Sequence, residues 1–122
     1  MILVDTSVWV DHLRRGDATL ADLLASAAVA VHPFVIGELA CGSLRRGSEV
    51  VTLLAELPAA TAVSHDEVIH FIAGYRLGGR GIGYVDAHLL ASAVVDGVPL
   101  WSRDKALHAE ATRLGVSYQA IL

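Results

Sequence analysis

The sequence has little cysteine, no long apolar run and no excess of positive charge, and each shortage excludes a class of protein. Cys41 is the only cysteine in 122 residues, so the chain can form neither an internal disulfide nor a cysteine-rich zinc site. We expect this thiol to be buried core on an apolar helix. No stretch approaches the roughly 18 to 20 uninterrupted apolar residues of a membrane span. The formal net charge of −4 argues against a basic nucleic-acid-binding module.

Hydrophobic residues are abundant instead, at 54% of the chain with a mean hydropathy of +0.54. The length fits one domain, residues 1–122, with a core of its own. A buried sheet and a subunit or partner interface would account for the surplus of apolar residues. Met1 leads directly into the first apolar segment without a basic region or a cleavage site. We therefore expect no signal peptide and a cytoplasmic protein.

Strand-like and helix-like patterns alternate along the whole chain. Apolar, β-branched runs predict short strands at 2–4, 28–31, 61–64, 98–101 and 116–118. Helical periodicity predicts helices at 8–14, 20–27, 33–44, 49–57, 66–75, 84–97 and 106–114. This alternation favours βαβ units. We expect a single α/β domain with a mostly parallel sheet of four to five strands, flanked by helices on both faces.

Four acidic residues stand at the ends of these elements or among apolar side chains. They are Asp5 after the first strand, Glu38 in the helix after the second, Asp86 in the first turn of 84–97, and Asp104 after the strand at 98–101. Strand ends and helix starts can share one end of a sheet, where open α/β sheets bind ligands. Ordinary structural explanations also exist for three of them, as helix caps, turn residues or solvated side chains. That explanation is weaker for Asp5, which directly follows a buried run.

If these carboxylates converge, their mutual repulsion requires a cation. Two unit charges about 4 Å apart repel by roughly 4 kcal/mol at an effective dielectric of about 20. Oxygen ligands alone select Mg²⁺ or Mn²⁺ over zinc, and in nucleases these ions activate water for attack on phosphorus. Three hydroxyls, those of Thr6, Ser7 and Ser102, are placed to hydrogen-bond the carboxylates.

Four segments resemble, in order, the four acidic motifs of PIN-domain ribonucleases, specifically the VapC-type toxins of prokaryotic toxin-antitoxin pairs. They are DTSVWVDHL, VIGELACGSL, GIGYVDAHLLASA and LWSRDKAL, and together they span essentially the whole chain. One departure is Ser102, where the family often has threonine; the hydroxyl is retained.

The resemblance implies a PIN-like fold and cleavage of RNA by an endoribonuclease that depends on Mg²⁺ or Mn²⁺ and inhibits translation. It also implies a homodimer and neutralisation by a cognate VapB-type antitoxin. Carried over by position, the catalytic and metal-binding acids are Asp5, Glu38, Asp86 and Asp104, with Asp5 and Asp86 the most direct ligands.

Arginines near the predicted site are candidates for contacts with RNA phosphates. They are Arg80 in the glycine-rich stretch at 78–83, Arg76 before it and Arg103 beside Asp104. A solvated surface position also explains each of them. Two further pairs lie at predicted helix ends, where contacts with the helix dipole would explain them: Arg14 with Arg15, and Arg45 with Arg46.

Other functions fit the sequence less well. A haloacid-dehalogenase-type phosphatase needs an aspartate two residues after the first, where this chain has Ser7. A phosphoacceptor receiver domain needs an acidic pair after the first strand, where Thr6 and Ser7 follow Asp5. A PIN-fold protein that binds RNA or a partner without cutting is the more serious alternative. The intact acids argue against it, and a measurement of activity decides between the two.

Overall fold

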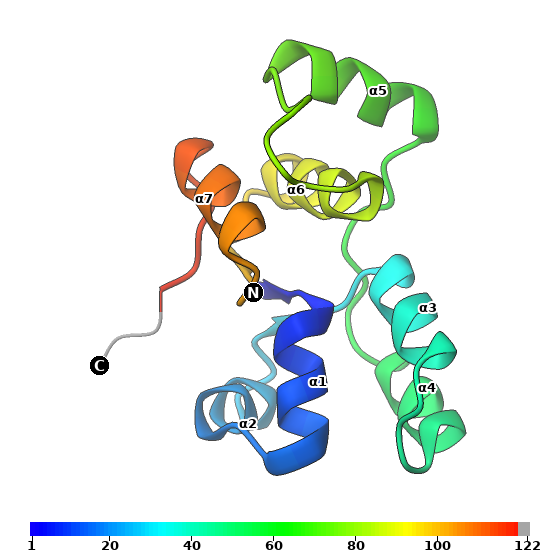
Figure 1. Ribbon diagram of the computed structural model, residues 1–122. Coiled ribbons are helices and arrows are strands. Elements are labelled where there is room, and N and C mark those ends of the chain that lie inside the picture. Colours follow the sequence, from blue (N-terminus) through cyan, green and yellow to red (C-terminus); the bar gives the residue numbers. More distant parts are fainter. Residues whose placement is uncertain (120–122) are drawn as a thin grey trace.

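The computed structural model describes residues 1–119 and contains a short parallel sheet surrounded by helices (Figure 1). The strands are β1 (Ile2–Val4), β2 (Val29–Ala30) and β3 (Leu100–Trp101), in the order β2-β1-β3. β1 is central: Ile2 pairs with Val29 and Leu3 with Leu100. Because β1 is flanked on both sides, Leu3 and Val4 are fully buried, and the opening apolar run forms the centre of the core.

Seven helices occur within the described residues. They are α1 (Thr6–Arg15), α2 (Ala18–Ala25), α3 (Pro33–Cys41), α4 (Gly47–Leu54), α5 (His65–Gly74), α6 (Tyr84–Asp96) and α7 (Lys105–Arg113). Figure 1 shows α1 and α2 below the strands, α5 and α6 above them, and α3 and α4 on the side opposite α7. α6 is the most enclosed helix, since every residue from 87 to 93 is buried. None of the helices in residues 1–119 is long and apolar enough to cross a membrane.

The sheet is narrower than the four to five strands expected from the sequence. Single parallel bridges, Val31 to Ala59 and Leu100 to Ser117, lie where its edges would continue. The segment at 61–64 forms no strand. The backbone N–H of Thr61 donates to Asp96 (2.8 Å), and its carbonyl accepts from Ser92 (2.6 Å). Side chains of α6 therefore form hydrogen bonds with backbone groups of Thr61 that would otherwise pair with a neighbouring strand.

Cys41 is exposed, which contradicts the expectation of a buried core thiol. It is the last residue of α3 and shares a helix face with Phe34, Gly37 and Glu38, which lies outside the core. Val35 and Leu39 occupy the buried face of α3 instead. An apolar composition does not reveal which face of a short helix is covered.

Each strand leads almost directly into a helix, and this arrangement gathers helix starts at one edge of the sheet. Asp5 is the N-cap of α1 after β1, His32 the N-cap of α3 after β2, and Asp104 the N-cap of α7 after β3. Because all strands are parallel, these caps lie at the carboxyl edge. The helix dipoles there favour negative charge.

Candidate metal centre

Asp5 is the most enclosed of the four predicted acids. Its side chain is only 6% exposed, and its Oδ2 accepts hydrogen bonds from the Ser7 and Ser102 hydroxyls, both at 2.8 Å. Ser102 is buried and also accepts the backbone N–H of Asp104 at 3.0 Å. These bonds join the end of β1 to the turn after β3 and orient the Asp5 carboxylate. The sequence placed both hydroxyls correctly beside this acid.

The other three acids each hold a local hydrogen bond with one oxygen. Thr6 donates its hydroxyl to Glu38 Oε1 at 2.6 Å. The backbone N–H of Gly83 donates to Asp86 Oδ2, and that of Leu107 donates to Asp104 Oδ1, each at 3.0 Å. All three predicted hydroxyls therefore contact a predicted acid, and each of these three carboxylates keeps its other oxygen free of hydrogen bonds within the described residues.

Asp86 shows that the acids act on one another. Burial raises the pKa of its carboxyl, the Gly83 N–H opposes this, and the negative charges of Asp5, Asp104 and Glu38 raise the pKa further. The four acids come from four separate elements (α1 cap, α3, α6 and α7 cap) yet share one electrostatic environment.

The chemistry of this donor set fits a hard divalent cation, because every donor is an oxygen. Among residues 1–119, however, no three acidic, histidine or cysteine side chains are arranged to hold a metal ion. Asp5, Asp86, Glu38 and Asp104 would be the ligands, with Thr6, Ser7 and Ser102 orienting them.

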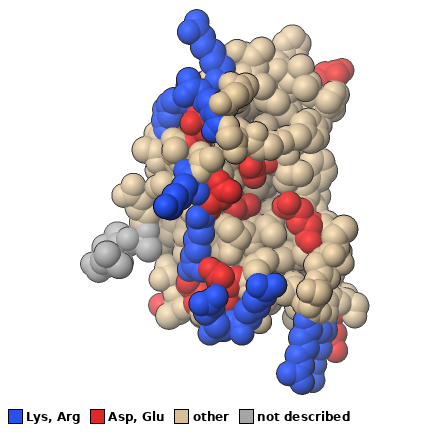
Figure 2. All heavy atoms as spheres, viewed as in Figure 1, with Lys and Arg blue, Asp and Glu red and all other residues tan. Residues whose placement is uncertain are grey.

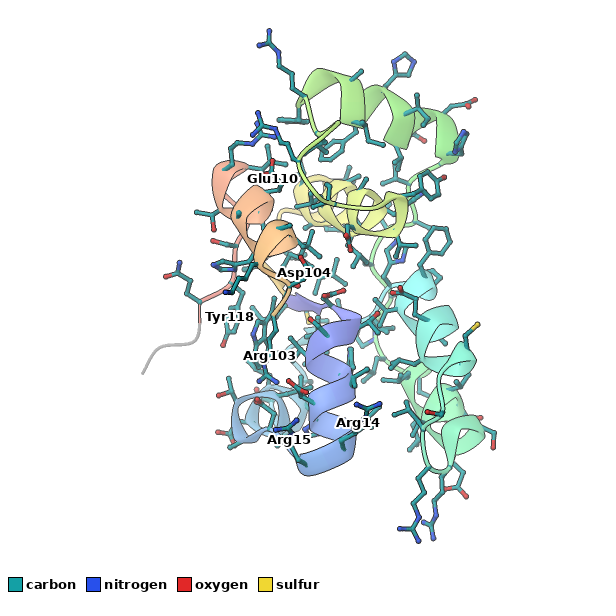
Figure 3. All side chains as sticks on the ribbon, viewed as in Figure 1. Arg14, Arg15, Arg103, Asp104, Glu110 and Tyr118 are labelled. Atoms are coloured by element: carbon teal, nitrogen blue, oxygen red, sulfur yellow. The ribbon has the colours of Figure 1, made fainter. Side chains whose placement is uncertain are left out.

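The candidate phosphate-binding arginines also make contacts within the protein. Arg103 is paired with Asp11 of α1 and Asp17, the N-cap of α2, and lies 5.8 Å from the Trp101 ring. Figure 3 shows Arg103 on the α1 and α2 side of Asp104. Its guanidinium is therefore engaged within the protein, while its backbone N–H donates to Ser7 at 3.0 Å.

The sequence analysis did not identify Glu110, a buried acid of α7 that contacts Arg80 of the glycine-rich loop. Its Oε1 accepts from Arg113 at 2.8 Å and lies 3.6 Å from the Nε of Arg80, which also donates to the carbonyl of Arg76 at 2.7 Å. Gly81 of this loop, with φ +84°, approaches α7 so closely that a Cβ would lie 3.5 Å from Ala106. The Nε of Arg80 is therefore used for contacts that stabilise the loop preceding Asp86. The spacing of Glu110 and Arg113 on one helix face was the available indication.

Two histidines are buried and lie near each other. His32 is 1% exposed and its Nδ1 accepts the Phe34 N–H at 3.0 Å as the α3 cap. His88, two residues after Asp86, is 3% exposed, and its ring centroid lies 6.3 Å from that of His32. Burial, assisted by the neighbouring His88, lowers the pKa of His32 to about 4.

We expect this histidine to make the fold sensitive to acid. Since the folded pKa of His32 lies below its ordinary value of 6.5, its contribution is complete above pH 6.5 and is lost as the pH falls toward 4. Between pH 7 and pH 5 the free energy of unfolding should fall by about 2 kcal/mol on account of His32. Urea unfolding at both pH values measures this. The variant His32→Asn keeps a cap acceptor and should show a flatter dependence; an equally steep one would contradict the assignment.

The chain is similar to known proteins over most of its length. The family model described as PIN domain matches residues 2–112. Ribonuclease VapC32 of Mycobacterium tuberculosis, in strains CDC 1551 / Oshkosh and ATCC 25618 / H37Rv, is 51% identical over 118 residues, covering 96% of this chain and 95% of the relative. The crystal structure of M. tuberculosis VapC20, described as a Sarcin-Ricin loop cleaving toxin, superposes with a TM-score of 0.66 at 24% identity, covering 90% of this chain and 95% of VapC20. This last likeness concerns the fold.

Proposed function

Because this chain belongs to the PIN-domain family, we propose that it is a metal-dependent endoribonuclease that hydrolyses RNA phosphodiester bonds. We propose further that it is the toxin of a VapBC-type toxin-antitoxin pair and inhibits translation in the cytoplasm. The observation that carries the proposal is the identity of 51% with Ribonuclease VapC32 over nearly the full length of both chains. The shared environment of Asp5, Glu38, Asp86 and Asp104 supports it.

The protein's own groups would hold the site and position the substrate. Asp5, fixed by Ser7 and Ser102, presents its Oδ1 from the edge of the sheet. Asp86, whose Oδ2 accepts the Gly83 N–H, would offer its other oxygen as the second direct ligand. When bound, Mg²⁺ or Mn²⁺ would supply an activated water and stabilise the leaving oxygen. No protein nucleophile is needed.

The surface has an apolar groove suited to a protein partner. Trp9 and Leu13 of α1, Leu24 of α2 and Leu53 of α4 line it, and Leu53 is 65% exposed. We assign this groove to an apolar segment of the cognate VapB-type antitoxin.

For a homodimer, the exposed aromatic rings of Phe34 and Tyr84 offer a second apolar surface. Sedimentation of the chain alone and with antitoxin measures both assemblies.

The test of the function is cleavage of RNA by the purified chain without antitoxin. We expect a panel of structured RNAs to be cut in Mg²⁺ or Mn²⁺ and not in EDTA, with activity restored when the metal is added back, as gel analysis of the fragments would show. Cleavage that persists in EDTA would exclude the metal-dependent mechanism. No cleavage of any RNA, together with no toxicity on expression, would instead favour a PIN-fold module that binds without cutting.

A further inference from the structure

We propose that a groove between the end of α1 and the α3–α4 loop binds backbone phosphates of the RNA substrate, away from the cleaved bond. We call it the arginine groove, because Arg14 of α1 and Arg45 and Arg46 of the loop line it. Ser43, Glu49 and apolar side chains complete its walls, and its volume is about 500 Å³. Leu13 and Leu53 also line the groove assigned to the antitoxin, so the two grooves adjoin. The proposal rests on the proposed endoribonuclease function and identifies a second contact region for its substrate.

The three arginines of the groove have no ion-pair partner in the described part of the chain. Among the other cations of the described residues, Arg15, Arg80, Arg103 and Arg113 pair with a carboxylate of the protein, whereas Arg76 and Lys105 do not. Glu49 lines the arginine groove but forms no ion pair there. Three cations from two distant segments therefore face one concave surface with their charge uncompensated, which is suited to a polyanion.

Arg46 does not stabilise the helix that it precedes. It is the N-cap of α4 and has φ 56° and ψ 40°, in the left-handed region, which costs an L-residue roughly 1–2 kcal/mol. Its positive charge lies at the positive end of the α4 dipole. The sequence-based explanation of Arg45 and Arg46 by a favourable helix dipole is wrong, because α3 already ends at Cys41 and Arg46 is the N-cap of α4. A bound anion would reverse the sign of this local electrostatic term.

The arginine groove lies on the same face as the acids. Figure 2 shows Lys and Arg gathered both above and below the acidic side chains of this face. α1 joins the two regions, with Asp5 as its N-cap and Arg14 in its last turn; the nine-residue separation corresponds to about 14 Å along the helix. Figure 3 shows Arg14 and Arg15 at the far end of α1 from Asp104. An RNA strand that follows α1 from the acids would reach the groove after a few nucleotides.

This placement explains how a chain of net charge −4 can bind RNA. Acids occupy the centre of the face, and Lys and Arg lie above, beside and below them. Guanidinium groups bind phosphate oxygens through paired N–H donors. Because the groove shares its face with the acids, we assign it to RNA and treat a protein partner as a competing outcome.

The test is binding of fluorescently labelled single-stranded RNA, measured by anisotropy in EDTA over a series of KCl concentrations. In the triple variant Arg14→Gln, Arg45→Gln, Arg46→Gln, we expect weaker binding and a plot of log affinity against log salt that is shallower by about 2, since each phosphate contact on a single strand contributes about 0.7. The wild-type slope should also increase when a short RNA is lengthened beyond the acids, and the variant slope should not.

Two further variants separate binding from folding. Arg15→Gln removes the neighbouring arginine, which does not line the groove, and should keep the wild-type slope. Arg46→Gly relieves the left-handed conformation and should melt at the same temperature as wild type or higher while binding RNA more weakly. A wild-type slope in the triple variant would overturn the proposal, as would weakened antitoxin binding with RNA binding intact. Failure of the wild type to cleave any RNA, with the slope change still present, would count against the proposed function alone.

Discussion

Replacing Asp5 by asparagine should lower RNA cleavage by about 1,000-fold, because losing several kcal/mol of transition-state stabilisation corresponds to a factor of that size. The change removes the charge of the most enclosed acid of the site, which is 6% exposed. Its amide oxygen can still accept from Ser7 or Ser102, so the neighbouring turn keeps a partner. Initial rates on a single RNA substrate in Mg²⁺ provide the measurement.

The fold should survive this substitution. The Asp5 side chain makes no capping hydrogen bond to α1, so the helix start does not depend on its carboxylate. Asp22→Asn is the matched control, since it makes the same chemical change on an exposed part of α2 and should cleave RNA like wild type. Near-wild-type cleavage by Asp5→Asn, with circular dichroism unchanged, would remove Asp5 from the proposed metal centre.

Replacing Asp86 by asparagine should abolish cleavage and, at pH 7 in EDTA, raise the melting temperature by several degrees. The pKa of this carboxyl is raised in the folded protein by burial and by three neighbouring negative charges, so its ionised form opposes folding. This penalty is complete above the folded pKa and disappears as the pH falls below the ordinary value of 3.8. Asparagine retains an acceptor for the Gly83 N–H that begins α6. Residues arranged for function commonly lower stability in this way.

Melting curves in EDTA, Mg²⁺ and Mn²⁺ measure the effect. Either metal should raise the melting temperature of the wild type by more than that of Asp86→Asn, since binding to the folded state alone is stabilising. Asp66→Asn is the control, because Asp66 is an exposed acid in the first turn of α5. Its loss should slightly lower the melting temperature through the helix dipole. A melting temperature of Asp86→Asn at or below that of wild type would contradict the repulsion inferred among the acids.

The elements that sequence predicted well are those specified by neighbours along the chain. The apolar run before Asp5 became β1, Pro33 opened α3, and Gly97 ended α6 with φ 63°. Periodicity, proline and a left-handed glycine act within a few residues. The three hydroxyls that contact the acids were also predictable, since two of them directly follow Asp5 and the third is two residues before Asp104.

The features that the sequence did not predict depend on contacts between residues distant in the chain. A strand was expected at 61–64, yet Thr61 is bound by Ser92 and Asp96 of α6. Cys41 was expected in the core, yet its face of α3 is exposed. Arg103 remains a candidate for contacts with RNA phosphates, and its pairing with Asp11 and Asp17 was not evident from the sequence. A side chain's partner across the fold cannot be deduced from its neighbours in sequence.

From the sequence alone we could predict that an acid follows the first strand and that three more occupy helix starts or an apolar helix. That Asp5, Glu38 and Asp104 lie near enough to raise the pKa of Asp86 follows from the fold, because their separation along the chain leaves their distances open until the parallel strands are paired. The same is true of Arg14, Arg45 and Arg46, which form one groove only after α1 and the α3–α4 loop are packed together. Local residue patterns specify helices and caps, whereas the packing of the sheet and helices brings distant charges together.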